Sequence, residues 1–333
     1  MPATWPSIKI IHRRSITRTV SFGKPSNFMN FLVDKIYRKR IKTVCGLIMS
    51  IALIFATPIT AAPGNENRFP SGDNVIYFGI LPYLSSTALI KTWRPLADYI
   101  GRTLHKKVII KTAPNFLSFL ERTAEGRYDL LMTAPHFAAL AVKNHGYRII
   151  AGHGNELTGD LVVAETSRFQ SIPDLRGKTI AMPGRLAAVS MLAELLLKQH
   201  GLMPNKDVLI SFTPAHNTAL IAVAEGRADA AVAVGGLYRR INASNKFAQL
   251  RRLATTKKIP HVMYIAGPAI SADEITVLRH ALISPVPGSP GAMAISQIKA
   301  NFNGGDITIV SADALQRLRP VVSLLESQLL KNE

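Results

Sequence analysis

The chain has 333 residues, 47% of them hydrophobic, so it can bury a core large enough for two lobes of ordinary domain size and is not an intrinsically disordered protein. Its net charge of +19 would by itself suit a nucleic-acid or membrane-surface partner. However, residues 1–62 carry +9 of this charge, and the other +10 is spread along the chain without basic runs interleaved with aromatic residues. A nucleic-acid partner is therefore not expected.

Residues 1–62 have the order of a secretory signal. The basic stretch KIYRKRIK at 35–42 precedes an apolar run of 13 residues at 44–56, and small residues follow. Because a bilayer span takes roughly 20 residues, a signal cleaved between Ala61 and Pro63 is favoured, and an uncleaved membrane anchor is the alternative. The mature protein is expected in the periplasm.

Two single residues of this segment add to the interpretation. Met29 would place a start codon at a more usual distance from the basic stretch, so we interpret the long leading sequence as a misassigned start. Cys45 is the only cysteine of the chain and lies inside the apolar run. The mature chain is therefore expected to have no disulfide and no thiol nucleophile.

One six-residue phrase occurs twice, as AEGRYD at 124–129 and as AEGRAD at 224–229. Each copy follows an apolar stripe at helical spacing, contains a glycine that can end a helix with positive φ, and leads into a short apolar run. Pro114 and Pro214 precede the two copies at the same offset. Each copy therefore predicts a helix, a glycine stop and a buried strand, and the spacing of 100 residues predicts two similar α/β lobes.

Other segments continue the alternation of strands and helices. We expect strands at 75–83, 107–114, 160–166 and 178–184, and helices at 86–104 and 187–201. In open α/β sheets, ligands bind beyond the carboxyl ends of the strands, close to helix N-termini. Those ends are Pro82 and Tyr83, Thr133 to His136, Met182 to Arg185, and Thr213 to Asn217.

The order of these motifs resembles the periplasmic substrate-binding proteins of phosphonate and phosphite ABC transporters. The resemblance covers roughly Val75 to Ile241 and continues more weakly to the C-terminus. It is carried by the stretches FGILPYLSSTALIKTWRPLADYIGRTL, GRYDLLMTAPHFAAL, SIPDLRGKTIAMPG and AHNTALIAVAEGRADAAV.

The resemblance implies an α/β, two-lobed type II periplasmic-binding fold. Each lobe would be a mostly parallel sheet flanked by helices, and two crossover strands would join the lobes and let them close on a ligand like a hinge. Lobe 1 is expected at 73–159 plus 264–333 and lobe 2 at 160–263. The crossovers are expected near Asp160–Glu165 and Pro260–Ala266.

The family's ligand contacts transfer only where residues match. Tyr83 matches the family's pocket tyrosine, and His216 in AHNTAL matches the histidine that contacts the anion. The stretch APHF, which includes His136, is similar to the family's Gly-Pro-His-Phe variant. The candidate ligand-binding residues are Tyr83, Thr133, His136, Arg185, Ser190, His216, Asn217 and His261.

The chain departs from the family after the strand at 178–184. Where the family has Ser-Thr-Ser-Gly, this chain has Ala187, Ala188, Val189 and Ser190, so three hydroxyl donors to the anion are missing. The family's acidic residues that recognise an amino group also have no counterpart, since His261 and glycines stand there. An aminoalkyl phosphonate is therefore not favoured as the ligand, and ligand identity stays open.

Structural roles compete with each ligand role. His216 could be a helix cap, Tyr83 could be packing against the loop, and His136 and Arg185 could be solvated surface residues. His261 depends on where the second crossover lies. These alternatives are decided by burial and hydrogen bonding, which the sequence does not give.

No catalytic signature is present. GHGNEL at 152–157 lacks the third glycine of a dinucleotide fingerprint, and the nine histidines have no metal-ligand spacing, so no cofactor or metal is expected. We expect a monomeric solute-binding protein, not an enzyme, that captures a small anion for an ABC permease. A ligand-sensing module for a membrane sensor, or an enzyme on the same fold, are the alternatives.

Overall fold

The computed structural model describes residues 74–302 and 304–331. The expected secretory signal, its expected cleavage site, Met29 and Cys45 lie outside the described residues. All described elements belong to the unit Gly64–Glu333. No helix of this described part is long and apolar enough to cross a membrane.

The first sheet has six strands in the order β13-β4-β12-β3-β1-β2. Strands β2, β1 and β3 are parallel, whereas β12 is antiparallel to both β3 and β4, and β13 is antiparallel to β4. The bounds are β1 Val75–Ile80, β2 Lys107–Lys111, β3 Leu130–Thr133, β4 Arg148–His153, β12 Met263–Ala266 and β13 Ile307–Thr308.

The second sheet has five strands in the order β10-β6-β9-β7-β8. Strands β8, β7 and β9 are parallel, and β6 is antiparallel to β9 and β10. The bounds are β6 Gly159–Ala164, β7 Thr179–Pro183, β8 Leu209–Thr213, β9 Ala230–Val234 and β10 Leu250–Thr255. Each sheet thus contains three parallel strands joined through helices, as the two-lobed fold requires.

A short antiparallel pair, β5 (Glu156–Leu157) and β11 (Ile259–Pro260), carries the chain between the sheets. The expected crossovers at Asp160–Glu165 and Pro260–Ala266 were placed a few residues too late. The first segment falls almost entirely in β6, whereas the second begins at Pro260 of β11 and continues into β12; β6 and β12 each hydrogen-bond within one sheet. The residue boundaries of the two lobes stay a prediction.

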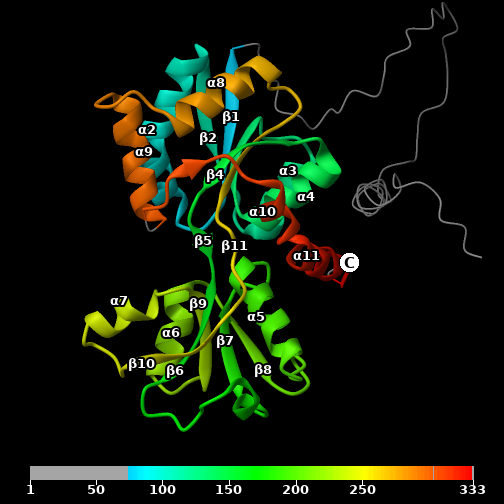
Figure 1. The fold of residues 1–333 in the computed structure, drawn as a ribbon, viewed down its shortest axis with the longest axis vertical. Helices are drawn as coiled ribbons and strands as arrows, with labels where there is room; N and C mark the ends of the chain where they lie inside the picture. The colour runs from blue at the N-terminus through cyan, green and yellow to red at the C-terminus, as the bar shows by residue number, and fades with distance from the viewer. Residues whose placement is uncertain (1–73, 303, 332–333) are drawn as a thin grey trace, which may run out of the picture. The chain divides into compact units, whose positions relative to one another are not determined.

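The helices alternate with the strands and flank the sheets (Figure 1). Their bounds are α2 Ser86–Leu104, α3 Phe116–Ala124, α4 Pro135–His145, 3-10 helix η1 Ile172–Leu175, α5 Ala188–Gln199, α6 His216–Ala224, α7 Tyr238–Ala243, α8 Ala272–Ile283, α9 Pro290–Asn301, α10 Ala312–Gln316 and α11 Arg319–Lys331. Helix α11 packs against α4 and also against α5, so it contacts both lobes.

The repeated phrase is confirmed as two copies of one structural corner. Helices α3 and α6 end just before Gly126 and Gly226, which have φ of 68° and 72°, and β3 and β9 follow. Each corner is then tied to the neighbouring strand, because Asp129 Oδ2 accepts from the Tyr77 amide and Asp229 Oδ2 from the Thr179 amide, both at 2.9 Å. The phrase therefore recurs because a positive-φ stop and a carboxylate acceptor are both needed there.

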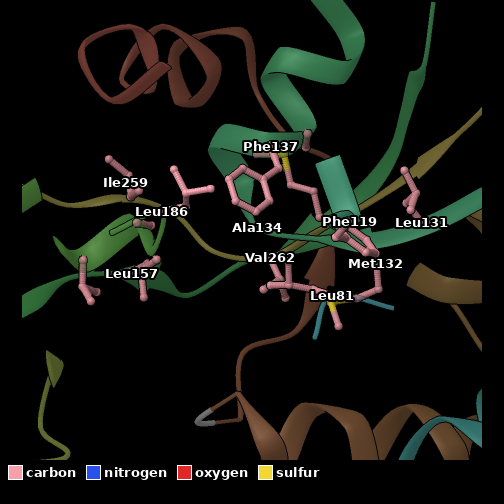
Figure 2. Packing of buried hydrophobic residues seen from close by; sticks show 14 of the residues in the cluster. Leu81, Phe119, Leu131, Met132, Ala134, Phe137, Leu157, Leu186, Ile259 and Val262 are labelled. Atoms are coloured by element: carbon pink, nitrogen blue, oxygen red, sulfur yellow. The ribbon is translucent and has the colours of Figure 1, made fainter. Parts of the chain in front are cut away.

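One apolar cluster runs through both lobes. It joins residues of the first sheet to Leu157 and Ile259 of the crossover pair and to Leu186, which precedes α5 (Figure 2). A second, smaller cluster packs α6 against β6 and β9. The turn before α5 is therefore held in the same core as the start of α4, and this contact positions the candidate site.

Candidate functional site

The first group of site residues lies where β3 ends and α4 begins. Thr133 is 1% exposed, and its Oγ1 is buried without a hydrogen-bond partner in the described structure. Pro135 starts the helix, which suits a residue without an amide hydrogen, and His136 follows it. The His136 ring is completely buried, so the alternative of a solvated loop histidine is wrong, and its role toward a ligand stays a prediction.

His136 reaches across to the other lobe. Its Nε2 lies 3.0 Å from the carbonyl oxygen of Leu186, in the turn that leads to α5. Burial lowers the pKa of His136 to about 4, although the Leu186 carbonyl opposes that shift. The ring is therefore neutral at pH 7, and its other nitrogen, Nδ1, is buried without a partner among the described residues.

The second group surrounds the start of α5. Ala187 is the N-cap and offers no side-chain hydrogen bond, and the amides of Ala188 and Val189 open the helix. Ser190 is fully buried and its hydroxyl donates to the Pro183 carbonyl at 2.7 Å. That hydroxyl hydrogen is therefore already used inside the protein, and backbone amides are the donors that this turn presents.

Arg185 lies on the surface of the same turn. Its guanidinium stacks 4.9 Å from the centre of the Phe212 ring in β8, and its side chain is exposed. This contact is a cation–π interaction, which such a pair favours. The structure therefore shows Arg185 engaged with an aromatic ring, and its role toward a ligand stays a prediction.

The third group lies at the start of α6. Ala215 is the N-cap, and Thr218 Oγ1 accepts from the Ala215 amide at 3.1 Å. The interpretation of His216 as a helix cap is therefore wrong, because Thr218 makes the capping hydrogen bond and His216 is the first helical residue. The His216 side chain is half-buried as a whole, but its Nδ1 is enclosed and has no described partner, and burial lowers its pKa to about 4. Asn217 is exposed.

The fourth group is an aromatic cluster that contains Tyr83 and His261. Both rings pack against Phe302 at the end of α9, with centroid distances of 5.8 Å and 5.4 Å. Tyr83 also accepts a hydrogen bond from Trp93 Nε1 at 3.1 Å, and burial raises its pKa. Tyr83 is thus anchored through its hydroxyl as well as its ring.

Two further residues complete this cluster. His153, the last residue of β4, lies with Nε2 3.2 Å from the Tyr264 hydroxyl and with its ring 4.9 Å from that of Phe302. The rings of His153 and His261 are 6.2 Å apart. Burial lowers the pKa of both histidines to about 4, and the neighbouring His261 lowers the pKa of His153 further. No member of the cluster carries a carboxylate.

The structure thus brings some predicted residues together. Tyr83 and His261 meet at Phe302, and His136 contacts the turn that holds Arg185 and leads into α5, where Ser190 lies. His216 and Asn217 start α6, with no described contact to the other candidates.

Sequence reasoning missed part of the aromatic cluster. His153 lies in GHGNEL, which the sequence analysis weighs only as a dinucleotide motif, although the apolar run at 149–151 before it is a usable strand signal. Phe302 follows a helix far along the chain and carries no local signal, because only tertiary packing brings it to Tyr83. Trp93 and Tyr264 lie inside ordinary apolar patterns.

Comparison with protein families gives a match over residues 78–298 to the family described as the periplasmic substrate-binding protein of the phosphonate ABC transporter. The match covers most of both sheets, from β1 through α9.

Solved structures share the fold. A binding-protein component of a phosphonate ABC transporter from Pseudomonas aeruginosa is 18% identical, with a TM-score of 0.61, over 76% of this chain and 87% of that one. PhnD1 from Prochlorococcus marinus, in complex with methylphosphonate, is 14% identical, with a TM-score of 0.66, over 77% and 99%. The aliphatic sulphonate-binding protein SsuA from Escherichia coli is 17% identical, with a TM-score of 0.52, over 77% and 93%. The expected two-lobed type II periplasmic-binding fold is confirmed.

Proposed function

The chain belongs to the family of periplasmic substrate-binding proteins of phosphonate ABC transporters, and from this membership we propose that it captures a small oxyanion between its two lobes. The family is one of transporter components and not of enzymes. The ligand would pass to a permease in the inner membrane, and the protein would work as a monomer after export.

Three enclosed polar atoms carry this proposal. Thr133 Oγ1 and His136 Nδ1 at the end of β3, and His216 Nδ1 at the end of β8, are buried without partners in the described structure. Buried polar atoms are otherwise almost always paired in proteins, so each such atom calls for a ligand or an ordered water. The two strands belong to different sheets, and both ends precede helix N-termini, where anions bind in α/β folds.

The chemistry of the site favours a ligand without an ammonium group. The aromatic cluster around Phe302 has neutral histidines and no carboxylate to pair with an amine. The start of α5 contributes backbone amides, because Ser190 donates internally and positions 187–189 have no hydroxyl. We therefore propose an oxyanion with an uncharged substituent, held mainly by amides, a threonine hydroxyl and imidazoles.

Binding is tested by calorimetry on protein recovered from the periplasm, with phosphate, phosphite, sulfate and pairs of alkyl- and arylphosphonates and sulfonates. We expect at least one of these anions to bind, and His216→Ala to weaken that binding. His200→Ala is the matched control, because His200 is exposed and bonds only to Leu196 of its own helix. Absence of binding by every anion would show that the ligand class is wrong.

Export is tested on the same preparation. We propose that residues up to about Ala62 are removed, because the basic and apolar segments have the order of a cleaved signal. An intact mass that begins near Ala62 or Pro63 supports cleavage. A mass that still includes Cys45 would show an uncleaved anchor.

A further inference from the structure

The hydrogen bond between the two lobes fixes the tautomer of His136. A carbonyl oxygen only accepts hydrogen bonds, so the contact of 3.0 Å between His136 Nε2 and Leu186 requires a hydrogen on Nε2. In a neutral imidazole the other nitrogen then has a lone pair and no hydrogen. His136 Nδ1 is therefore an acceptor, and it lies buried without a described partner.

The surroundings of the ring favour this neutral form. Helix α4 packs against α3, α11, β4 and β12, and α5 follows the Leu186 turn. The ionisable side chains of these elements include Glu121, Arg122, Arg148, His153, Glu194, Lys198, Tyr264, Arg319 and Glu326, with Lys143 and His145 on α4 itself. None of them shifts the pKa of His136, which depends on burial and on the Leu186 carbonyl alone. The lone pair on Nδ1 is thus kept by enclosure and not by a nearby cation.

A donor stands close to this acceptor in the sequence. Thr133 is the last residue of β3, and its enclosed Oγ1 has no described partner either. A threonine hydroxyl can donate to an oxyanion, whereas His136 Nδ1 can only receive a hydrogen. The pair suits a ligand that has both a bare oxygen and a hydroxyl on the same central atom.

We propose that His136 accepts a hydrogen bond from a protonated oxygen of the ligand, so that the site takes hydrogen-bearing oxyanions of phosphorus and rejects sulfonates. This inference rests on the proposed binding of an oxyanion at this site. A hydrogenphosphonate or hydrogenphosphite carries a P–OH group that can donate to Nδ1. A sulfonate has three bare oxygens, and one of them would face the Nδ1 lone pair without a hydrogen between them.

The binding test compares matched pairs of ligands that differ in the central atom. Calorimetry is run at about pH 6, below the second ionisation of an alkylphosphonate, with methyl-, ethyl- and phenylphosphonate against methane-, ethane- and benzenesulfonate. We expect each phosphonate that binds to exceed its sulfonate by about tenfold or more, since the sulfonate leaves two acceptors facing each other. Equal binding within the pairs would keep the proposed function and overturn this inference. If none of the six binds, and phosphate, phosphite and sulfate do not bind either, both fall.

A second measurement uses the wild-type protein, because His136→Ala could fail to fold after losing its bond to Leu186. Nitrogen-15 NMR of the histidine rings with saturating phosphonate reports the state of both His136 nitrogens. We expect Nε2 to keep its hydrogen and Nδ1 to move in the direction of a nitrogen that accepts a hydrogen bond. An unchanged Nδ1 signal would show that the ligand does not reach it, and signals of a doubly protonated ring would show a donor. Either result overturns the inference.

Discussion

Restoring two hydroxyl groups at the start of α5 should strengthen phosphonate binding. Ala187 and Ala188 are each 8% exposed, and they stand where the family has hydroxyl residues. A hydrogen bond from a hydroxyl to a charged acceptor contributes about 1.5–3 kcal/mol. The double change Ala187→Ser and Ala188→Thr is therefore expected to strengthen binding of methylphosphonate by about 3 kcal/mol or more, roughly a hundredfold.

Val189 is better changed in a separate step. It is 1% exposed, and its Cβ lies 3.3 Å from the position that a Cβ on Gly159 would take. Val189→Ser removes apolar volume from this tight contact and buries a hydroxyl, which costs about 1–3 kcal/mol of stability. A comparison of the double and triple changes therefore separates the gain in affinity from the loss in stability.

Calorimetry with methylphosphonate measures the effect, and chemical unfolding measures stability in parallel. Ser190→Ala is the control next to these positions. The Ser190 hydroxyl donates to the Pro183 carbonyl, so its removal should lower stability without changing affinity. The reasoning is refuted if the wild type already binds methylphosphonate at submicromolar concentration. In that case the backbone amides and the imidazoles would suffice, and the missing hydroxyls would not limit affinity.

Three further predictions concern single residues and pH. His216→Ala should weaken ligand binding by about 1–3 kcal/mol, measured by calorimetry. Thr218→Ala should instead lower the free energy of unfolding by about 1 kcal/mol and leave affinity unchanged, because Thr218 only caps the helix. Stability should fall as pH drops from 6.5 toward 4, because the unfolded state then binds more protons than the folded state, in which four histidines have a pKa of about 4. The fully buried His136 alone contributes up to about 3 kcal/mol, and urea titrations at several pH values test this; a flat profile would contradict it. Gly126→Ala and Gly226→Ala should each cost about 1 kcal/mol in chemical unfolding, since an added Cβ meets nothing within 4 Å and only positive φ opposes it; unequal losses would point to a contact at one corner.

Local patterns predict the elements of this fold because their causes are local. The helix expected at 86–104 is α2 from Ser86 to Leu104, and the apolar runs after each repeated phrase are β3 and β9. The crossovers were displaced because β5 and β11 are two residues long and carry no pattern of their own. Pairing with the opposite chain segment, which the sequence does not display, makes them strands.

The site was predicted less completely because its side chains act through distant contacts. His136 lies at the strand end that sequence reasoning selected, but its burial and its bond to Leu186 depend on the fold across 50 residues. Ser190 was expected as a ligand donor, and its hydroxyl instead closes a bond to Pro183, seven residues away. Residue type and position therefore locate a polar group, whereas the direction of its hydrogen depends on neighbours that only the fold supplies.

In each lobe the repeated phrase lies where a helix ends and a strand begins, whereas the candidate site residues lie where strands end and helices begin. At the phrase, Asp129 and Asp229 make the same bond to a neighbouring strand, and the two lobes are built alike. At the other end of the helices the lobes differ, since Asn115 caps α3 with its own side chain, whereas Ala215 relies on Thr218. Strand β3 then ends in Thr133, while β9 ends in Val234 beside two glycines. The corner is the same in both lobes because the backbone there needs a positive-φ glycine and a carboxylate acceptor. The carboxyl ends of the strands have no such shared requirement, so the side chains there can differ between the lobes.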